Sequence, residues 1–440
     1  MIDYTLPLDH LPDPLPIEPL PKPFDVTITP PGSKSITNRA YVLAALASGE
    51  SRIVRPLRSD DCDLLLDALH TLGAEADWDG PDVLITGVNG RFPRGGRVNL
   101  GDGGAPTRFM IAAACLAEDA VVVDGSPRMR QRPVAEGVQM LRELGAEISY
   151  LEEDGRLPVR VMPAMLGGSE LEIGHTHSSQ FISALMLIAP RLSFPLKLWF
   201  VTETTSRSYV TLTQHVAKRW GVEFHDATHA DGRRSVFVYN RAYPGRTYEI
   251  EADASSATYW LAAAAVAPKS GARIEGLPPT SPQADIGFVK LLEAQGARRE
   301  HFGRNSIGMH HHHRLKGCEL DMSDMPDAAI TFAVAMVTAD GPTIINGLHT
   351  LKLKESDRIE ALANELRKIG CMAATSDNSI AIDPSGKHEE PVVIETYNDH
   401  RIAMAFAVLG LVRPNISIAD PKCVKKSYPG FWRDFATLYH

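Results

Sequence analysis

The 440-residue sequence has few cysteines and no spacing that would pair them. Its five cysteines are odd in number and widely separated, and no two form a Cys-x-x-Cys motif. This pattern predicts reduced thiols and not a disulfide framework. The cysteines are Cys62, Cys115, Cys318, Cys371 and Cys423.

Long hydrophobic runs are also absent. The apolar stretches at 41–47, 110–117, 260–267 and 403–412 are far shorter than the roughly 18 residues that a transmembrane helix needs. The N-terminus lacks the basic start and apolar stretch of a signal peptide. We therefore expect a cytoplasmic protein with no membrane partner.

An excess of positive charge is missing as well. The chain has 45 basic and 54 acidic residues, and its net charge is −9. This balance argues against nucleic acid as a partner. An anionic ligand would need a local cationic pocket. The length predicts about two to three domains.

The clearest architectural signal is an internal repeat. Five segments share one pattern, in which an amphipathic helix ends at a glycine and a strand, a polar turn and a second strand follow. The glycines lie 72 to 76 residues apart, and a sixth unit could be split between the termini. We predict a pseudo-symmetric α/β protein with two similar lobes, a crossover near residue 250, and the first strand returning to the later lobe. The glycines are Gly73, Gly145, Gly221, Gly296 and Gly370.

Seven prolines occupy the first 23 residues. They predict an extended, polyproline-like stretch that cannot be helical. Whether this stretch is a flexible tail or an arm laid over the body stays open.

Cations gather at predicted helix starts. In "PGSKSITNRA" (31–40), Lys34 and Arg39 lie near the positive end of a helix dipole, where added cations are unfavourable. "GDGGAPTRFM" (101–110) is a glycine-rich turn before a helix and could hold an anion. "SPRMRQRP" places Arg128, Arg130 and Arg132 at alternate positions, so an extended segment would project all three from one side as an anion clamp or as a solvated strand.

Other segments add hydroxyls, carboxylates and further cations. Helix capping or a solvated surface would explain each segment alone. A small polyanionic ligand held between two lobes explains them together. The segments are "HSSQF" (177–181), "TSRSY" (205–209), "DMPDAA" (324–329), "LKLKESDR" (351–358), "YNDHRIAMAF" (397–406) and "DPKCVKKSYP" (420–429).

These motifs occur in the order typical of one enzyme family. From about residue 26 to the C-terminus, the chain resembles the 5-enolpyruvylshikimate-3-phosphate synthases, also called 3-phosphoshikimate 1-carboxyvinyltransferases. The resemblance implies an inverted α/β barrel fold, with two lobes of three βαβαββ units each and the active site in the cleft between them. It divides the chain into a proline-rich arm (1–25), one lobe from 26–32 and 252–440, and a second lobe from 33–251.

The resemblance also implies substrate contacts, residue by residue. Shikimate 3-phosphate would contact Lys34, Ser35, Arg39, Ser178, Ser179, Gln180, Ser206, Tyr209, Asp327 and Lys354. Phosphoenolpyruvate would contact Lys34, Gly104, Arg132, Gln180, Arg358, Arg401 and Lys426.

The implied reaction transfers the enolpyruvyl group of phosphoenolpyruvate to the 5-hydroxyl of shikimate 3-phosphate by addition and elimination. Paired carboxylates suit its proton transfers, and the family pattern assigns Asp327 to the hydroxyl and Glu355 to C3. Lys34 and Lys426 would stabilise charge on the leaving phosphate. No metal or organic cofactor is expected, and we expect a monomer.

The glycine-rich loop departs from the family pattern. Relatives usually read Gly-Asn-Ala-Gly-Thr where this chain has 101–105 as Gly-Asp-Gly-Gly-Ala, followed by Pro106. The loop borders the phosphoenolpyruvate site in the family, so Asp102 is expected to repel that anionic substrate. In the competing account, Asp102 pairs with Arg108 or Arg132, or caps the helix that follows, and so sets the shape of the loop. The unusual histidine run 310–313 is expected to form a solvated hairpin turn and could bind metal adventitiously.

Two rival functions remain possible. UDP-N-acetylglucosamine enolpyruvyl transferases share the fold and the donor, but they usually carry a reactive cysteine where this chain has Pro127. A non-catalytic relative could bind phosphorylated shikimate, although retention of both Asp327 and Glu355 argues against it.

Overall fold

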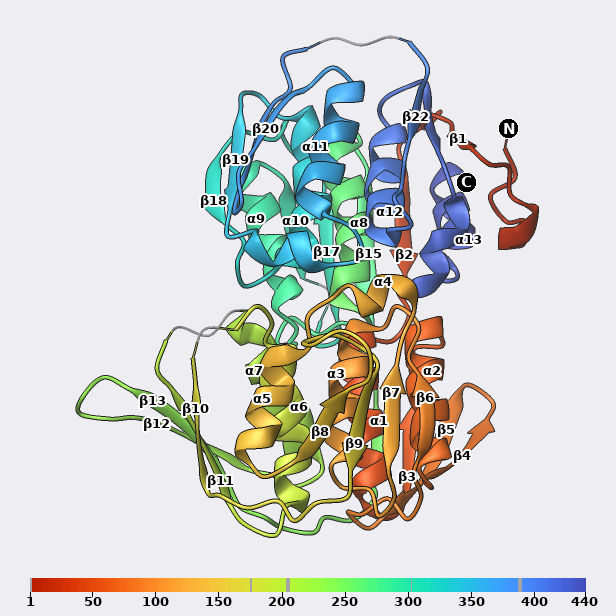
Figure 1. Ribbon diagram of the computed structural model, residues 1–440. Helices are drawn as coiled ribbons and strands as arrows, with labels where there is room; N and C mark the ends of the chain where they lie inside the picture. Colours follow the sequence, from red (N-terminus) through yellow and green to blue (C-terminus); the bar gives the residue numbers. More distant parts are fainter. Residues whose placement is uncertain (1, 175, 203–205, 302, 387–389) are drawn as a thin grey trace. The chain divides into compact units, whose positions relative to one another are not determined.

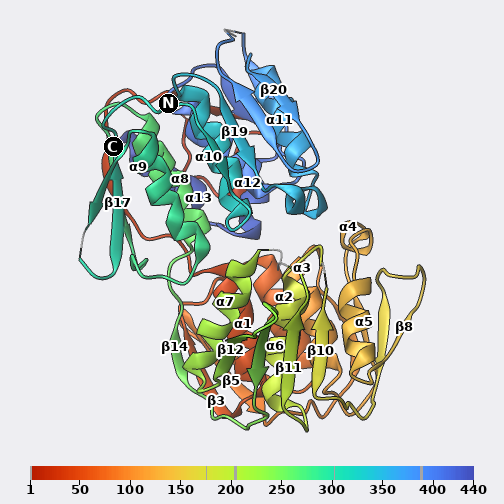
Figure 2. The same cartoon turned by 90° about the vertical axis from the view of Figure 1, so that its left-hand side faces the viewer.

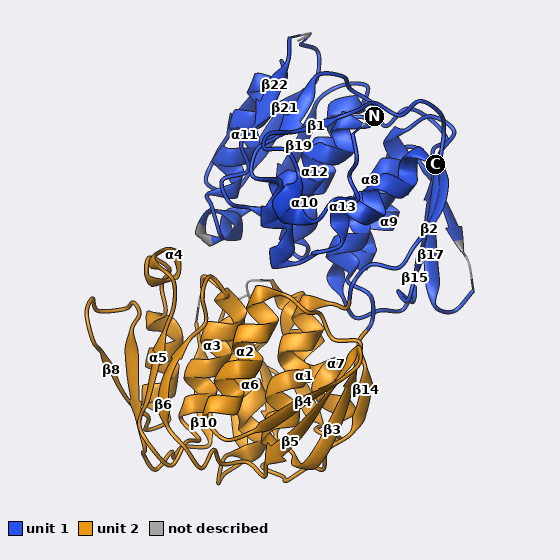
Figure 3. Cartoon of the chain, turned by 90° about the vertical axis from the view of Figure 1, so that its right-hand side faces the viewer, with its two compact units in different colours: residues 1–31, 251–440 blue, residues 32–250 orange. Residues whose placement is uncertain are grey.

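A computed structural model describes residues 2–174, 176–202, 206–301, 303–386 and 390–440. The chain forms two compact units: unit 1 comprises Met1–Pro31 and Glu251–His440, and unit 2 comprises Gly32–Ile250 (Figure 3). Within the described ranges, no helix combines the length and the apolar character that a membrane span requires.

Unit 2 contains three four-stranded sheets of one topology (Figures 1 and 2). In each sheet, a central strand pairs in parallel with one neighbour and antiparallel with a hairpin. The first sheet is β14 (Thr247–Glu249), β3 (Ser48–Val54), β5 (Asp82–Val88) and β4 (Glu75–Asp79). The second is β6 (Gly96–Asn99), β7 (Val121–Asp124), β9 (Val159–Met162) and β8 (Glu147–Tyr150). The third is β10 (Glu170–Ile173), β11 (Leu196–Phe200), β13 (Arg234–Val238) and β12 (Phe224–Thr228).

Unit 1 repeats this topology twice and ends in a three-stranded variant. Its first sheet is β16 (Arg298–His301), β17 (Ser306–His310), β15 (Gly271–Glu275) and β2 (Asp25–Ile28). Its second is β18 (Glu319–Asp321), β19 (Thr343–Asn346), β21 (Ile380–Asp383) and β20 (Met372–Thr375). Its third is β1 (Leu15–Ile17), β23 (Ile416–Ile418) and β22 (Val392–Ile394).

Helices connect the strands of each sheet. Those of unit 2 are α1 (Lys34–Leu46), α2 (Asp60–Thr71), α3 (Gly104–Ala114), α4 (Pro127–Arg130), α5 (Ala135–Glu143), α6 (Gln180–Ile188) and α7 (Arg207–Arg219). Those of unit 1 are α8 (Ala254–Val266), α9 (Phe288–Gln295), α10 (Pro326–Ala335), α11 (Arg358–Lys368), α12 (His400–Gly410) and α13 (Phe431–Ala436). Short 3₁₀ helices are η1 (Leu8–His10), η2 (Ala189–Arg191), η3 (Ala284–Gly287), η4 (Met336–Thr338), η5 (His349–Leu353), η6 (Pro421–Lys426) and η7 (Thr437–Tyr439).

In each unit, one strand pairs with a strand far away in the chain. Strand β2 precedes unit 2 in the chain but pairs in parallel with β15 of unit 1. Strand β14 ends unit 2 and pairs in parallel with β3, far earlier in the chain. The chain thus passes from unit 2 to unit 1 after Ile250, and its strand β2 joins the sheet of β15. The two-lobe α/β fold class is confirmed.

The five spaced glycines occupy the predicted position after a helix. All five have positive φ, from 77° at Gly221 to 121° at Gly296. Glycine tolerates this conformation because it has no Cβ. The antiparallel hairpins β4–β5, β8–β9, β12–β13, β16–β17 and β20–β21 follow. The internal repeat was thus read correctly.

The proline-rich N-terminal stretch is an ordered part of unit 1. Strand β1 pairs antiparallel with β23, so it occupies the place that a hairpin takes in the other five sheets. Tyr4 is 3% exposed and stacks on Tyr439 with ring centroids 5.5 Å apart. The prediction of extended chain without helix fails only at η1, a single 3₁₀ turn.

Three buried helices form the centre of each unit. In unit 2, α1, α3 and α6 pack against one another, and in unit 1 α8, α10 and α12 do so. Nearly every residue of these helices is buried, which explains why their sequences are apolar on all sides. Most of the predicted site residues lie at or near the first turns of these helices.

Candidate active site

Asp327 lies in the first turn of α10, directly after Pro326. Its Oδ1 accepts a hydrogen bond from Arg358 Nη1 at 2.8 Å, and its Oδ2 accepts one from Arg401 Nη2 at 3.0 Å. Lys354 Nζ lies 3.6 Å from Oδ1. Burial alone would raise the pKa of Asp327, but the charges of Arg401, Lys354 and Arg358 outweigh it and hold the pKa well below its usual range.

Arg358 joins three carboxylates of unit 1. It begins α11 and is 1% exposed. Its Nε donates to Asp399 Oδ2 at 2.6 Å and its Nη2 donates to Asp399 Oδ1 at 3.1 Å. Nη2 also forms an ion pair with Glu355 Oε2 at 2.8 Å. Burial lowers the pKa of Arg358, but Asp399, Glu355 and Asp327 raise it above its ordinary value, so the guanidinium stays charged.

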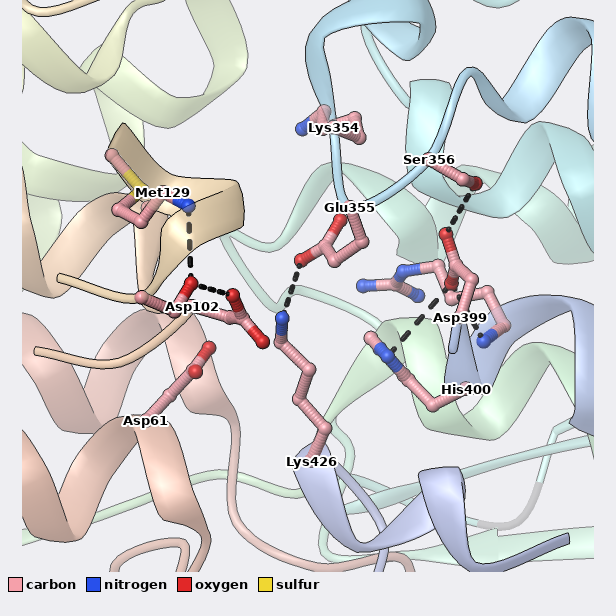
Figure 4. Close-up of polar contacts among 12 residues, drawn as sticks. Asp61, Asp102, Met129, Lys354, Glu355, Ser356, Asp399, His400 and Lys426 are labelled. Carbon is pink, nitrogen blue, oxygen red and sulfur yellow. Dashed lines mark hydrogen bonds and ion pairs between the residues drawn. The ribbon is translucent and has the colours of Figure 1, made fainter. Parts of the chain in front are cut away.

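Glu355 lies between two cations. Besides its ion pair with Arg358, its Oε1 is 3.3 Å from Lys426 Nζ, and Figure 4 shows the Lys426 side chain extending toward it. Lys426 ends η6, the segment that carries the "DPKCVKKSYP" motif. Unit 1 therefore brings together six predicted residues: Asp327, Lys354, Glu355, Arg358, Arg401 and Lys426.

In unit 2, Lys34 is compensated by a carboxylate from the next helix. Its Nζ lies 3.1 Å from Asp61 Oδ2, and Asp61 is in the first turn of α2. Asp61 is 4% exposed. A carboxylate in the first turn of a helix interacts favourably with the helix dipole, so Asp61 is stabilised there while it offsets Lys34.

Arg39 is held by neutral groups within the described part of unit 2. Its guanidinium donates to Thr213 Oγ1 at 2.8 Å, to Ser183 Oγ at 3.1 Å, and to the carbonyl oxygens of Ser35 and Tyr209. Burial lowers the pKa of Arg39 to about 10. Arg39 therefore ties α1 to α6 and α7 and fixes the backbone at two other predicted residues.

Gly104 makes room for Arg132. A Cβ added at Gly104 would lie 2.6 Å from Arg132 Nη2, closer than atoms can approach. Arg108 supports the same loop: it donates to the Gly104 carbonyl at 3.0 Å and to Gln180 Oε1 at 2.9 Å. Three predicted residues, Gly104, Arg132 and Gln180, are thus gathered around Arg108 and the start of α3.

Asp102 is bound by a hydroxyl group. Ser126 Oγ donates to Asp102 Oδ1, and the same Oγ accepts a hydrogen bond from Met129 N at 3.1 Å, which caps α4 (Figure 4). The N-cap of α3 is Gly103, with no side-chain cap. The alternative in which Asp102 caps α3 is therefore wrong, and the carboxylate instead contacts the cap of α4.

The chain is similar to known proteins along almost its whole length. The family model of EPSP synthase (3-phosphoshikimate 1-carboxyvinyltransferase) matches residues 20–435. The chain belongs to the EPSP synthase family. The 3-phosphoshikimate 1-carboxyvinyltransferase of Methanoculleus marisnigri is 39% identical over 93% of this chain and 96% of its own length. That of Tolumonas auensis is 37% identical over 96% of this chain and 99% of its own length.

Solved structures agree on the fold. EPSP synthase from Acinetobacter baumannii aligns with a TM-score of 0.78 at 24% identity, over 96% of this chain and 98% of that one. The enolpyruvyl transferase NikO from Streptomyces tendae aligns with a TM-score of 0.75 at 16% identity, over the same 96% of this chain and 98% of its own. The fold expected from the family resemblance is confirmed.

The predicted row of three arginines is wrong for this EPSP synthase family member. Residues 127–130 form the helical turn α4, because Pro127 and the Ser126 cap start a helix. Arg130 then turns to Asp124 and Glu152, at 2.8 Å from each. Arg128 contacts Gln131 on the surface. Only Arg132 reaches the glycine-rich loop, where Nη1 lies 3.5 Å from the Asp102 carbonyl oxygen.

The predicted serines lie at two helix starts. Ser179 is the N-cap residue of α6, without a side-chain cap bond, and Ser178 Oγ accepts from Gln180 N at 3.3 Å. Ser206, the N-cap residue of α7, has a left-handed backbone with φ of 48°, which is uncommon outside glycine. Helix capping by the side chain therefore does not explain Ser179 or Ser206. Thr205, the first residue of the "TSRSY" motif, lies outside the described residues.

Sequence reasoning assigned no place in the site to four buried charged residues: Asp61, Arg108, Asp285 and Asp399. Asp399 was noticed only as a polar residue at the start of the helix that is now α12. It caps α12 by accepting from Arg401 N at 3.0 Å, as well as binding Arg358. The three aspartates all lie at helix starts, and that position was the available signal.

The histidine run does not form a hairpin turn. His310 ends strand β17 and forms an ion pair with Glu300 of β16, and residues 311–313 follow the hairpin. Among the described residues, no group of three or more histidine, cysteine, aspartate or glutamate side chains is placed to hold a metal ion.

Proposed function

We propose that this chain transfers the enolpyruvyl group of phosphoenolpyruvate to the 5-hydroxyl of shikimate 3-phosphate and releases phosphate. The observation that carries the proposal is the placement of two carboxylates, Asp327 and Glu355, on one buried guanidinium, Arg358. Addition to the enol double bond and the later elimination both move protons, and two fixed carboxylates provide one proton-transfer group each.

The cations of unit 1 are proposed to bind the donor. Arg401 and Arg358 would receive the carboxylate of phosphoenolpyruvate, with Arg401 the more available because Arg358 is engaged by three carboxylates. Lys426 would receive the donor phosphate, together with Lys34, Arg132 and Gln180 of unit 2. Guanidinium and ammonium groups suit these roles because both stay charged at neutral pH.

Shikimate 3-phosphate is proposed to bind mainly at unit 2. Lys34, Ser35, Ser178, Ser179, Gln180, Ser206 and Tyr209 would contact it, with Asp327 and Lys354 from unit 1. We assign Arg39 a positioning role beside any direct contact, because its donors fix the backbone at Ser35 and Tyr209. The strained backbone of Ser206 supports a binding role, since such strain is concentrated at functional sites.

In the addition step, Asp327 takes the proton of the 5-hydroxyl. At the same time, the hydroxyl oxygen forms a bond to C2 of the donor. Glu355 gives a proton to C3, and a tetrahedral adduct results. The low pKa of Asp327 makes it a weak base as long as Arg401 and Lys354 face it alone. Substrate anions would neutralise these cations and so raise the basicity of Asp327 when the reaction begins.

In the elimination step, a proton leaves C3, the bond from C2 to the phosphate oxygen breaks, and the double bond forms again. Glu355 accepts the C3 proton, and Asp327 gives the hydroxyl proton to the departing phosphate. Lys426, 3.3 Å from Glu355, and Lys34 stabilise the negative charge of the departing phosphate. The reaction as proposed uses no metal or organic cofactor, and we propose that the chain acts as a cytoplasmic monomer.

Phosphate release tests the proposal. The purified chain is mixed with phosphoenolpyruvate and either shikimate 3-phosphate or UDP-N-acetylglucosamine, and inorganic phosphate is measured over time. We expect release only with shikimate 3-phosphate. Release with the nucleotide sugar would favour the rival transferase, and binding of shikimate 3-phosphate without release would show a non-catalytic protein.

A further inference from the structure

Unit 2 contains a cavity that is lined by none of the residues of the proposed site. Its volume is about 790 Å³, within the range of small-molecule sites. It is formed by the end of α7, the start of β12 and the segment 239–246 that leads into β14. Figures 2 and 3 both show α7 and β14 next to each other in unit 2.

Two arginines line this cavity, and neither is paired with a carboxylate among the described residues. Arg241 and Arg246 are both exposed, and neither guanidinium forms an ion pair or a hydrogen bond with any other described residue. Arg246 Nη2 lies against Gly221, 3.4 Å from where a Cβ would be. Most other arginines of unit 2 face a carboxylate, a carbonyl or a ring. Two guanidinium groups in one concavity can bind an oxyanion, because their N–H groups match carboxylate and phosphate oxygens.

Aromatic side chains form the rest of the wall. Tyr239 is 61% exposed. Its ring packs edge-to-face with that of Phe237, with centroids 4.7 Å apart, and this contact restrains the Tyr239 ring. Trp220 and Tyr243 are buried at the base. The Trp220 Nε1 and the Tyr243 hydroxyl are buried donors that have no acceptor among the described residues. Both atoms lie below the accessible surface, so the hydrogen bonds to a ligand in this cavity would come from the arginines.

The cavity is separate from the proposed substrate residues of the same helix. Ser206 and Tyr209 lie at the start of α7, whereas Trp220 and Gly221 follow its last residue. Thirteen helical residues separate the two ends, a distance of about 18 Å at 1.5 Å per residue. A ligand in the cavity would therefore contact neither of them.

We propose that this cavity, bounded by Trp220, Tyr239, Arg241, Tyr243 and Arg246, binds a planar ring that carries an anionic group. The ring lies against Tyr239, and the oxyanion lies between Arg241 and Arg246. A carboxylate and a phosphate ester share this chemistry, and both fit two guanidinium groups. Glu223 also lines the cavity, and its carboxylate would repel an anion. The site therefore favours ligands whose negative charge lies next to Arg241 and Arg246.

Calorimetric titration of the full chain tests the site, with saturating shikimate 3-phosphate present to occupy the substrate residues. The probes are phenyl phosphate, benzoate, phenol and inorganic phosphate. We expect phenyl phosphate or benzoate to bind with a dissociation constant of about 1 mM or below. Phenol and inorganic phosphate each lack one half of the recognised group and should bind at least about tenfold more weakly. The tighter of the two anionic rings identifies the preferred oxyanion.

Variants then locate the binding. Arg241→Gln and Arg246→Gln should each weaken the better probe by about tenfold, and Glu223→Gln should tighten it. Arg160→Gln is the matched control, because Arg160 is also exposed but lies on β9 outside the cavity. Phosphate release by all four variants should equal that of the parent. Absence of binding by both anionic rings, or binding that survives both arginine substitutions, would overturn the proposal.

Discussion

Asp399 binds Arg358 through both of its carboxylate oxygens, at 2.6 Å and 3.1 Å, and both side chains are buried. The pair links two helices, since Asp399 caps α12 and Arg358 begins α11. Figure 4 shows Asp399 also within reach of Ser356, whose Oγ lies 3.3 Å away. Asp399 thus fixes the guanidinium that holds both proposed catalytic carboxylates.

We predict that Asp399→Ala lowers the free energy of unfolding by about 3–5 kcal/mol, because breaking a buried pair leaves an uncompensated charge. The Michaelis constant for phosphoenolpyruvate should rise in the same variant as Arg358 loses its orientation. Urea unfolding and steady-state kinetics measure the two effects. The control is Asp357→Asn, because Asp357 caps α11 at the surface by accepting from Glu360 N and asparagine caps equally well. Equal stability of Asp399→Ala and the parent would refute the role of the pair.

Asp327→Asn should remove most of the turnover while shikimate 3-phosphate still binds. Loss of one general base lowers a rate about 10²–10⁴-fold. Asparagine keeps the shape of the side chain, so the substrate contacts of the other residues stay in place. Turnover is followed by phosphate release and binding by calorimetry, with the exposed Asp324→Asn as the control. A variant that retained more than about a third of the parent rate would disprove the assignment of the base.

Asp102→Asn should lower the Michaelis constant for phosphoenolpyruvate. If the carboxylate lies about 5 Å from the donor, repulsion is about 1 kcal/mol in water and about 3 kcal/mol at an effective dielectric constant of 20. Relief of each 1.4 kcal/mol lowers the constant about tenfold. The melting temperature should change little, because an asparagine oxygen can still accept from Ser126 Oγ.

Ser126→Ala separates this effect from loop stability. It removes both the contact with Asp102 and the cap of α4, and should reduce the free energy of unfolding by about 0.5–2 kcal/mol without relieving repulsion. A raised or unchanged Michaelis constant in Asp102→Asn would show that the carboxylate shapes the loop instead of repelling the donor.

Asp285 gives unit 1 a pH-dependent stability. Burial, with a contribution from the charge of Asp327, raises the pKa of Asp285 to about 6, although Ser255 Oγ donates to it. Because the folded pKa exceeds the unfolded value, this group stabilises the fold at low pH, and the stabilisation is lost as the pH rises from about 4 to about 6. The full change is about 3 kcal/mol at 1.36 kcal/mol per pKa unit.

Asp285→Asn should therefore be more stable than the parent above pH 6, and the difference should shrink by about 3 kcal/mol as the pH falls to about 4. Urea unfolding of both proteins across this range measures it. Asp377→Asn is the control, because the Asp377 side chain is 97% exposed. A difference that does not vary with pH would mean that Asp285 does not titrate in this window.

The sequence by itself determined the repeat and the fold class. The positive φ at Gly73, Gly145 and the three later positions favours glycine. Burial on all sides requires the central helices to be apolar. Both patterns are therefore visible along the sequence. The family motifs likewise named the six residues that meet in unit 1. These features depend on local backbone geometry or on the order of the family motifs along the chain.

Only the tertiary structure decided which charges meet. Lys34 and Asp61 belong to different helices, and Asp399 lies 41 residues from Arg358. The direction of the Arg130 side chain depends on the local backbone. Because Pro127 and the Ser126 cap start a helix at 127–130, Arg130 forms an ion pair with Asp124. The N-terminal stretch became a strand because the last sheet lacked a hairpin to pair with β23. The ion pairs between helices and the pairing of β1 with β23 follow from partners distant in sequence, which no local pattern encodes.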